Sequence, residues 1–262
     1  MKVVLFCGGL GTRLREHSET IPKPLVCIGN RPIIWYLMKY YAFYGHNEFI
    51  LCLGYKGNDI KNYFLNYQET DSNDFVFSEG GKNIQLLGED LHDWKITFAD
   101  TGQSSNIGER LKAVKKYIGD DEYFLANYSD GLSDVNLDEL VKNARETGAV
   151  ASFVVVRPPH SFHSVKSMDN GIVQEIKEVN EADYWVNGGF FVLKNEIFDY
   201  MREGEELVEE PFRRLVKINK LYAKKYEGFW TAMDTLKDKK RLDSIYASGI
   251  LPWMIWSKDK DQ

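Results

Sequence analysis

The sequence predicts an α/β fold in which a mostly parallel sheet is flanked by helices, with a smaller C-terminal α+β portion. Two observations carry this prediction. Short, continuous apolar runs alternate with segments of helical apolar spacing through residues 1–156, and continuous apolar runs are typical of buried parallel strands. The turns between these segments are short, which is the pattern of a parallel sheet with helices on both faces.

The first strand covers residues 3–7 and ends at Gly8 and Gly9. Further strands are predicted at 49–53, 96–99, 123–128 and 150–156. Apolar residues that recur every three to four positions predict helices at 32–44, around 60–64, at 107–117 and at 137–147. Ligands bind at the carboxyl ends of the strands in such sheets, so the loops that follow the strands are the place to look for a site.

Two regions depart from this alternation. Residues 71–92 are polar and contain glycine, so we expect a hairpin or an excursion from the core. After residue 157 the strands become shorter, at 172–176 and 190–193, and helices follow. We interpret residues 157–262 as an α+β portion laid over the sheet edge, within the same domain as the 1–156 core.

Composition excludes several classes of partner and of location. The net charge of -6 argues against nucleic acid or a membrane surface as the main partner. Cys7, Cys27 and Cys52 are widely spaced and lie in or beside apolar runs, which indicates reduced core thiols in a cytoplasmic protein. The N-terminal residues lack a basic segment followed by a long apolar one, so we expect no secretory signal. No apolar window is long enough for a transmembrane helix.

The most informative segment is the glycine-rich loop after the first strand. Gly8, Gly9 and Gly11 let backbone N–H groups approach an anion closely. Thr12 adds a hydroxyl donor, and Arg13 adds a guanidinium suited to phosphate oxygens. A lysine between two prolines follows in Pro22-Lys23-Pro24. The spacing fits neither the P-loop nor the dinucleotide fingerprint, so the loop predicts a phosphate-rich ligand in another α/β class.

With this loop the sequence resembles the sugar-1-phosphate nucleotidyltransferases, whose signature is a GGxGTRL loop followed by Lys-Pro. The resemblance is more particular to the glucose-1-phosphate cytidylyltransferase branch and covers nearly the whole chain in order. The matching motifs are Gly54-Tyr55-Lys56-Gly57 with Ile60, Tyr63 and Phe64, then Asp100-Thr101-Gly102 with Ser104, Ser105 and Gly108 to Arg110, then Asn187-Gly188-Gly189-Phe190-Phe191-Val192-Leu193, then Gly228-Phe229-Trp230, and finally Met233-Asp234-Thr235.

The resemblance implies a Rossmann-like nucleotidyltransferase fold, with residues 1–156 binding the nucleotide and 157–262 binding the acceptor. It also implies a homo-oligomer, CTP as the nucleotide and Mg2+ as the cofactor. A phosphate oxygen of the acceptor would attack the α-phosphorus of CTP and pyrophosphate would leave. Asp130, in Tyr128-Ser129-Asp130-Gly131, and Asp234 would ligate the metal. Arg13 and Lys23 would be catalytic by offsetting phosphate charge, and no general base is needed because a phosphate monoester is already ionised.

The remaining predicted contacts follow from the same resemblance. Nucleotide-binding residues are expected at Leu5, Gly8, Gly9, Gly11, Thr12, Arg13, Lys23, Ser105 and Arg110. Acceptor-binding residues are expected at His163, Glu178, Val179, Asn187, Gly188 and Trp230. Arg110 would read the cytosine edge, and its alternative interpretation is a surface cation on a helix.

Several residues depart from the family pattern. The family's Glu-Lys-Pro on the acceptor side is Glu178-Val179-Asn180 here, so the lysine that binds the sugar phosphate is absent. Lys177 should point to the opposite face of the strand. Phe162-His163-Ser164 replaces an aromatic followed by glycine and a small residue. Lys166, His160 or His163 could supply the missing charge. In the nucleotide-binding part, Asn106, Ile107 and Glu109 replace the expected Met, Thr and Gly.

These departures leave alternatives open. The acceptor could be a non-sugar phosphate such as L-glutamine phosphate, as in the CTP:phosphoglutamine cytidylyltransferase of capsular phosphoramidate synthesis. The nucleotide could be UTP or dTTP. A regulatory homologue that binds nucleotide without turnover is a further class, although the retention of Arg13, Lys23, Asp130 and Asp234 argues against it.

Overall fold

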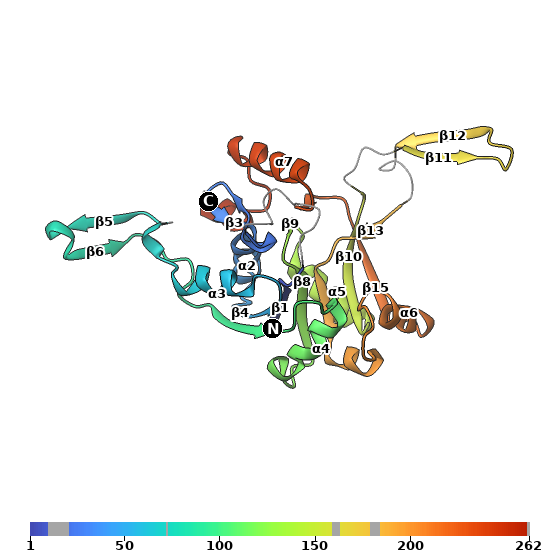
Figure 1. Cartoon of the computed structure of the whole chain (residues 1–262), viewed down its shortest axis with the longest axis horizontal. Helices are drawn as coiled ribbons and strands as arrows, with labels where there is room; N and C mark the ends of the chain where they lie inside the picture. The colour runs from blue at the N-terminus through green and yellow to red at the C-terminus, as the bar shows by residue number, and fades with distance from the viewer. Residues whose placement is uncertain (10–20, 72, 159–162, 179–183, 261–262) are drawn as a thin grey trace.

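The computed structural model describes residues 1–9, 21–71, 73–158, 163–178 and 184–260, which form an eight-stranded mixed sheet with helices on both faces (Figure 1). The strand order is β13-β10-β14-β8-β1-β4-β7, and β15 pairs with β10. Strand β1 pairs in parallel with β4 and β8, and β4 pairs in parallel with β7. The predicted α/β class with a mostly parallel core is confirmed.

The strands of this sheet are β1 (Val3–Phe6), β4 (Glu48–Leu53), β7 (Lys95–Asp100), β8 (Tyr123–Tyr128), β10 (Ala151–Val156), β13 (Val186–Asn187), β14 (Phe191–Lys194) and β15 (Leu221–Tyr226). The α-helices in the described ranges are α2 (Ile33–Phe43), α3 (Gly57–Leu65), α4 (Ile107–Ile118), α5 (Leu137–Thr147), α6 (Glu210–Lys217) and α7 (Leu236–Ala247). Within these ranges, no helix is long and apolar enough to cross a bilayer.

The alternation of side chains along each strand builds a separate core on each face of the sheet. Val3 and Leu5 point into a core that also contains residues of α2 and α5, and Trp253 closes this core near the C-terminus. Val4 and Phe6 point into the opposite core, which α4 and α6 cover. Because both faces are covered, the strands need apolar residues at every position, which is why they read as continuous apolar runs.

The chain order creates a crevice at the carboxyl edge of the sheet. From β1 the chain passes to β4 and β7 on one side, and it then returns to β8 on the other side of β1. The loops that follow β1 and β8 therefore diverge at this edge, and such a switch point is where α/β sheets bind ligands.

The C-terminal portion differs from the predicted arrangement over the sheet edge. Strand β14 lies inside the sheet, antiparallel to both β8 and β10. Phe191, Val192 and Leu193 are at most 1% exposed, so this run is buried on both faces and requires a central place. Cys27 also differs from the prediction, because it is exposed while Cys7 and Cys52 are buried core thiols.

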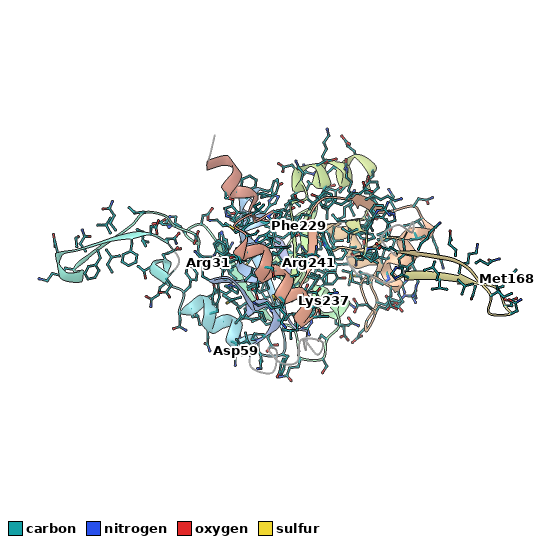
Figure 2. All side chains as sticks on the ribbon, turned by 90° about the horizontal axis from the view of Figure 1, so that it is seen from above. Arg31, Asp59, Met168, Phe229, Lys237 and Arg241 are labelled. Atoms are coloured by element: carbon teal, nitrogen blue, oxygen red, sulfur yellow. The ribbon has the colours of Figure 1, made fainter. Side chains whose placement is uncertain are left out.

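Two β-ribbons extend away from the body in opposite directions (Figures 1 and 2). The first consists of β5 (Phe75–Ser78) and β6 (Asn83–Leu86) and confirms the hairpin predicted within 71–92. The second consists of β11 (His163–Ser167) and β12 (Val173–Glu178), with Met168 at its tip in Figure 2.

A buried polar network anchors the first ribbon to the body. Arg31 lies just before α2, is 7% exposed and pairs with Asp90 Oδ2 at 2.5 Å. Its guanidinium also donates to the Tyr67 hydroxyl at 2.6 Å. Asn73 donates to Asp90 at 3.1 Å, and Glu69 accepts the Asp90 N–H. These charge-assisted bonds fix both ends of the excursion, although its tip stands free of the core.

Candidate active site

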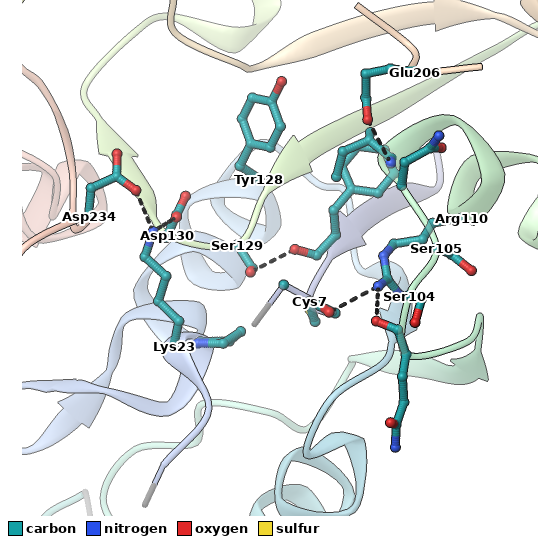
Figure 3. Close-up of a pocket in the computed structure, with 17 residues that line it drawn as sticks. Cys7, Lys23, Ser104, Ser105, Arg110, Tyr128, Ser129, Asp130, Glu206 and Asp234 are labelled. Atoms are coloured by element: carbon teal, nitrogen blue, oxygen red, sulfur yellow. Dashed lines mark hydrogen bonds and ion pairs between the residues drawn. The ribbon is translucent and has the colours of Figure 1, made fainter. Parts of the chain in front are cut away.

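A cavity of about 490 Å3 lies at the carboxyl edge of the sheet, beside the ends of β1 and β8 (Figure 3). The residues that line it come from segments far apart in the sequence: Phe6, Cys7, Gly8, Gly9, Lys23, Pro24, Gln103, Ser104, Ser105, Asn106, Ile107, Arg110, Tyr128, Ser129, Asp130, Glu206 and Asp234. A volume of this size suits a small-molecule ligand.

One end of the cavity holds Lys23 between two carboxylates (Figure 3). The Lys23 ammonium donates to Asp234 Oδ1 at 2.6 Å and to Asp130 Oδ2. The side chains of Lys23 and Asp130 are only 16% and 19% exposed. Burial opposes the charged form of Lys23, but the attraction of Asp130 and Asp234 prevails and raises the pKa of the lysine above its usual value. The site therefore contains one cation and two anions that hold each other in place.

The fold brings these residues together through short secondary elements. Lys23 begins the 3-10 helix η2 (Lys23–Leu25), and Asp130 is the second residue after the end of β8. Strand β16 (Trp230–Ala232) pairs with β9 (Gly131–Ser133), so the residues after β8 lie beside those before α7. The Met233 N–H donates to the Asp130 carbonyl at 3.0 Å, which fixes the two aspartates next to each other.

The described part of the glycine-rich loop lies at the same edge. Gly8 and Gly9 line the cavity, and Ser129 donates to the Phe6 carbonyl at 2.8 Å, which ties the end of β8 to the end of β1. Leu5, which was expected to contact the nucleotide, is 0% exposed and packs in the core, because its side chain points away from the strand end. The other predicted loop residues, Gly11, Thr12 and Arg13, lie outside the described residues.

The side chain of Arg110 lines the cavity and bonds to the backbone at the strand ends. Its terminal nitrogens donate to Gly8 O at 2.9 Å, Leu53 O at 3.2 Å and Gly102 O at 2.9 Å. The same group donates to the Thr101 hydroxyl at 2.8 Å. Arg110 is 3% exposed, so the interpretation of a surface cation is wrong, and burial lowers the pKa of this guanidinium. Its role in reading the base stays a prediction, but both terminal nitrogens already have protein acceptors.

These hydrogen bonds of Arg110 also explain why residue 8 is glycine. A Cβ at Gly8 would lie 2.1 Å from Nη1 of Arg110, and a Cβ at Gly54 would lie 2.8 Å from it. The two glycines therefore allow the guanidinium to reach the backbone carbonyl groups of neighbouring strands.

The other end of the cavity is built around the start of α4. Ser105, a predicted nucleotide-binding residue, lines the cavity and donates to Thr101 O at 2.6 Å. Asn106 accepts the Glu109 N–H at 2.8 Å while the Glu109 carboxylate accepts the Asn106 N–H at 2.9 Å. Asn106 and Glu109, two of the departures from the family pattern, thus form a capping box that starts the helix.

Glu206 reaches this end of the cavity from the loop before α6. Its Oε2 accepts the Ile107 N–H at 3.2 Å, and its Oε1 accepts the Leu207 N–H at 3.0 Å. Burial raises the pKa of Glu206 above its usual value, while these backbone donors act in the opposite direction. A carboxylate therefore forms part of the cavity wall next to the α4 N-terminus (Figure 3).

Three of the predicted acceptor residues lie together one side chain away from the cavity. Asn187 donates to the hydroxyl of Tyr128, which lines the cavity, at 3.1 Å. The Trp230 indole N–H donates to Gly188 O at 2.8 Å. The turn that carries these residues depends on Asn127, whose side-chain oxygen accepts the Phe190 N–H at 3.0 Å.

The remaining acceptor residues do not join this group. His163 and Glu178 are paired across the second ribbon at the end nearest the body, and neither lines the cavity. Val179 and His160 lie outside the described residues. Lys177 pairs with Glu175 at 2.5 Å on the other face of the ribbon, as its place in the strand predicted.

The sequence analysis did not identify Glu206, which lines the cavity, or Asn127, which supports the turn before β14. Asn127 is the one strongly polar residue in the run 123–128, and a polar residue in a buried strand is a signal that could have identified it. Glu206 lies in an acidic stretch over 203–210, where the sequence offers nothing to distinguish it from its neighbours.

Comparison with known proteins gives one consistent family. The family model described as nucleotidyl transferase matches residues 2–238. A probable glucose-1-phosphate cytidylyltransferase of Bacillus subtilis is 40% identical over 258 residues, covering 98% of this chain and 100% of that protein. The glucose-1-phosphate cytidylyltransferase of Salmonella typhi is 38% identical with the same coverage. Among solved structures, a UTP-bound UGPase from Acinetobacter baumannii matches with a TM-score of 0.70 at 18% identity, covering 98% of this chain and 97% of that one, which supports the fold.

We expect Arg110→Met to lower the free energy of unfolding by about 3 kcal/mol, because it leaves several buried carbonyl oxygens without a donor. Urea unfolding followed by circular dichroism measures this change. Lys112→Met, on the exposed side of the same helix, is the control and should stay within about 0.5 kcal/mol of the wild type. Equal stability of the two variants would contradict the prediction that the hydrogen bonds of Arg110 stabilise the fold.

Proposed function

The chain belongs to the nucleotidyl transferase family and is an enzyme, and on that premise we propose that it transfers CMP from CTP to a sugar 1-phosphate, glucose 1-phosphate foremost, with release of pyrophosphate. The observation that carries the proposal is the meeting of Lys23, Asp130 and Asp234 at one end of the cavity. The two relatives of the same length, 38–40% identical, are named for this activity.

The reaction requires charge compensation and alignment more than covalent chemistry. A phosphate oxygen of the acceptor forms the bond to the α-phosphorus of CTP. The bond from this phosphorus to the oxygen that bridges to the β-phosphate breaks, and pyrophosphate leaves with the electron pair. Lys23 is proposed to offset negative charge on the reacting phosphates, and the N–H groups of Gly8 and Gly9, two residues that line the cavity, are proposed to bind phosphate oxygens. Arg13 is proposed to stabilise the leaving pyrophosphate.

We propose that Asp130 and Asp234 hold Mg2+. Their fit to a cation is supported by the Lys23 ammonium, which both carboxylates already bind. Bound Mg2+ would neutralise charge on the nucleotide phosphates. In the described part of the chain, no group of three or more His, Cys, Asp or Glu side chains could hold a metal. Phosphate oxygens and water would then complete the coordination, as is usual for Mg2+.

A second candidate acceptor is a non-sugar phosphate such as L-glutamine phosphate, as used in capsular phosphoramidate synthesis. The sequence observation that favours it is Glu178-Val179-Asn180, where the family has Glu-Lys-Pro. Loss of a cation that pairs with a buried phosphate should cost several kcal/mol unless another group replaces it. A different acceptor is one way in which the chain could tolerate that loss.

We also propose that the protein is a homo-oligomer. On the first ribbon, Phe75 and Phe77 share a face with Ile84 and Leu86, and Phe77 and Ile84 are 63% and 50% exposed. A free two-stranded ribbon is only marginally stable in water. The second ribbon also carries an exposed apolar face, around Val165 and Ile176, at the other end of the molecule. Two such faces on one chain suit contacts between identical copies, so a second copy is proposed to cover the first ribbon.

We propose a cytoplasmic location for this reaction. The support is that Cys7 and Cys52 are free and buried and that Cys27 is free and exposed. Free thiols are typical of reducing compartments.

The proposed function is tested by pyrophosphate release with Mg2+ and CTP. Glucose 1-phosphate, other hexose 1-phosphates and L-glutamine phosphate are compared as acceptors. We expect the highest kcat/KM with glucose 1-phosphate. Turnover with L-glutamine phosphate alone would support the second acceptor. Absence of pyrophosphate with every acceptor and with CTP, UTP and dTTP would contradict an active nucleotidyltransferase and favour the regulatory homologue.

The metal assignment predicts that Asp130→Asn and Asp234→Asn each lower kcat at least about a hundredfold without unfolding the chain. Titration with Mn2+, followed by electron paramagnetic resonance, should give weaker binding to both variants. Thermal melting serves as the folding control.

The variant Lys23→Met should change the affinity for Mn2+ in the opposite direction. Removing the ammonium frees both carboxylates, so Mn2+ should bind this variant more tightly than the wild type in the absence of nucleotide. Unchanged Mn2+ binding in all three variants would rule out Asp130 and Asp234 as the metal site.

The oligomer proposal predicts that Phe77→Glu lowers the sedimentation coefficient of the protein, because it places a charge in the covered apolar face. Gln85→Glu is the matched control, since Gln85 lies on the opposite face of the same ribbon. A wild-type protein that sediments as a monomer would refute the proposal, as would equal behaviour of the two variants.

A further inference from the structure

The cavity has two chemically different ends (Figure 3). Lys23, Asp130 and Asp234 form the charged end, where the phosphates and metal of the proposed reaction belong. The opposite end is formed by residues 103–107, Arg110 and Glu206. A nucleotide bound with its phosphates at the first end extends its base toward the second. The groups at the second end therefore decide which base is accepted.

Arg110 cannot make this choice by itself. Its Nη1 donates to Leu53 O, Gly102 O and the Thr101 hydroxyl, and its Nη2 donates to Gly8 O and, at 3.4 Å, to Gln103 O. A guanidinium only donates, and cytosine and uracil both carry a carbonyl oxygen at O2, so a bond from Arg110 to that oxygen would not separate the two bases. Another polar group at this end is then needed to distinguish one pyrimidine from the other.

Glu206 has the position and the free acceptor capacity for this role. Two backbone N–H groups, from Ile107 and Leu207, hold its carboxylate in place. An ionised carboxylate has about four lone-pair sites, so these two donors leave acceptor capacity toward the cavity. Within the described ranges, no ion pair joins Glu206 to a Lys, Arg or His.

A purely structural role for Glu206 at the α4 N-terminus accounts for only part of this arrangement. The capping box already supplies acceptors for the Asn106 and Glu109 N–H groups at the start of the helix. Glu206 accepts the Ile107 N–H, but it does so from a separate loop and from the wall of the cavity. A neutral side chain would give a similar cap without the cost of a half-buried charge.

Cytosine and uracil differ at the edge that a carboxylate can read. Cytosine carries an exocyclic amine, which donates, where uracil carries a carbonyl oxygen, which only accepts. A carboxylate accepts a bond from the amine and repels the carbonyl. Specificity of this kind is large because the wrong base leaves a buried acceptor unpaired.

We propose that the Glu206 carboxylate accepts a hydrogen bond from the exocyclic amine of cytosine and thereby selects CTP over UTP. The inference rests on the proposed function, because it takes a pyrimidine nucleoside triphosphate as the ligand of the cavity.

The test measures nucleotide binding by calorimetry without any acceptor, so that it does not depend on turnover. CTP, UTP and dCTP are each titrated into the wild type, Glu206→Gln, Glu206→Ala and the control Glu203→Gln, which removes an exposed carboxylate of the same loop. We expect the CTP-to-UTP affinity ratio to fall about ten- to one hundredfold in both Glu206 variants. The Gln variant should also gain affinity for UTP, because its amide can donate to the uracil carbonyl. Glu203→Gln should keep the wild-type ratio.

The possible failures are distinguishable. A wild type that binds none of the three nucleotides would refute the proposed function itself. A wild type that binds CTP and UTP equally, or folded Glu206 variants that keep the wild-type ratio, would overturn only the assignment of Glu206. A loss of discrimination between CTP and dCTP, with the CTP-to-UTP ratio unchanged, would also overturn it, because Glu206 would then bind the ribose hydroxyl. Melting temperatures establish that each variant is folded, and the Ala variant avoids placing an amide donor against the Ile107 N–H.

Discussion

The buried guanidinium of Arg110 is the interaction on which the geometry of the cavity depends. Parallel strands end at the same edge of a sheet, and their last carbonyl groups must find donors away from bulk water. Arg110 donates at once to the carbonyl of Gly8 after β1, to that of Leu53 at the end of β4 and to that of Gly102 after β7. Within the described residues no carboxylate forms an ion pair with it, so neutral oxygens stabilise its charge beside Gly8 and Gly9. An anionic ligand would complete this electrostatic balance.

The positive charge of Lys23, at the other end of the cavity, is balanced in a different way. Lys23 is neutralised by two carboxylates, whereas Arg110 is held by neutral acceptors. Mg2+ bound to Asp130 and Asp234 as proposed would compete with the ammonium for the two carboxylates. The oxygens of a triphosphate would offer Lys23 other acceptors, so that the carboxylates could hold the metal alone. Under this proposal, Lys23 would become available to the phosphates when a metal binds the aspartates.

Regular elements could be predicted from the sequence because local pattern determines them. The bounds of α5, Leu137–Thr147, coincide with the prediction, since its apolar spacing is clear and Gly148 in a left-handed conformation ends it. The place of β14 between β8 and β10 could not be predicted, because pairing depends on partners far away in the sequence. The site residues show the same contrast between local pattern and long-range packing. Lys23, Asp130 and Asp234 were identified through motifs, but the hydrogen bonds of Arg110 and the position of Glu206 depend on how distant loops fold together.

The departures from the family pattern have different physical meanings. Asn106 and Glu109 line or adjoin the cavity, yet their side chains bond to each other as a helix cap, so they change how α4 begins without requiring a new ligand. His163, another departure, instead lies where the second ribbon joins the body, opposite Glu178 and away from the residues that line the cavity. A change in acceptor would therefore act through the base of this ribbon and the turn at Asn187, while the nucleotide end of the cavity keeps its chemistry.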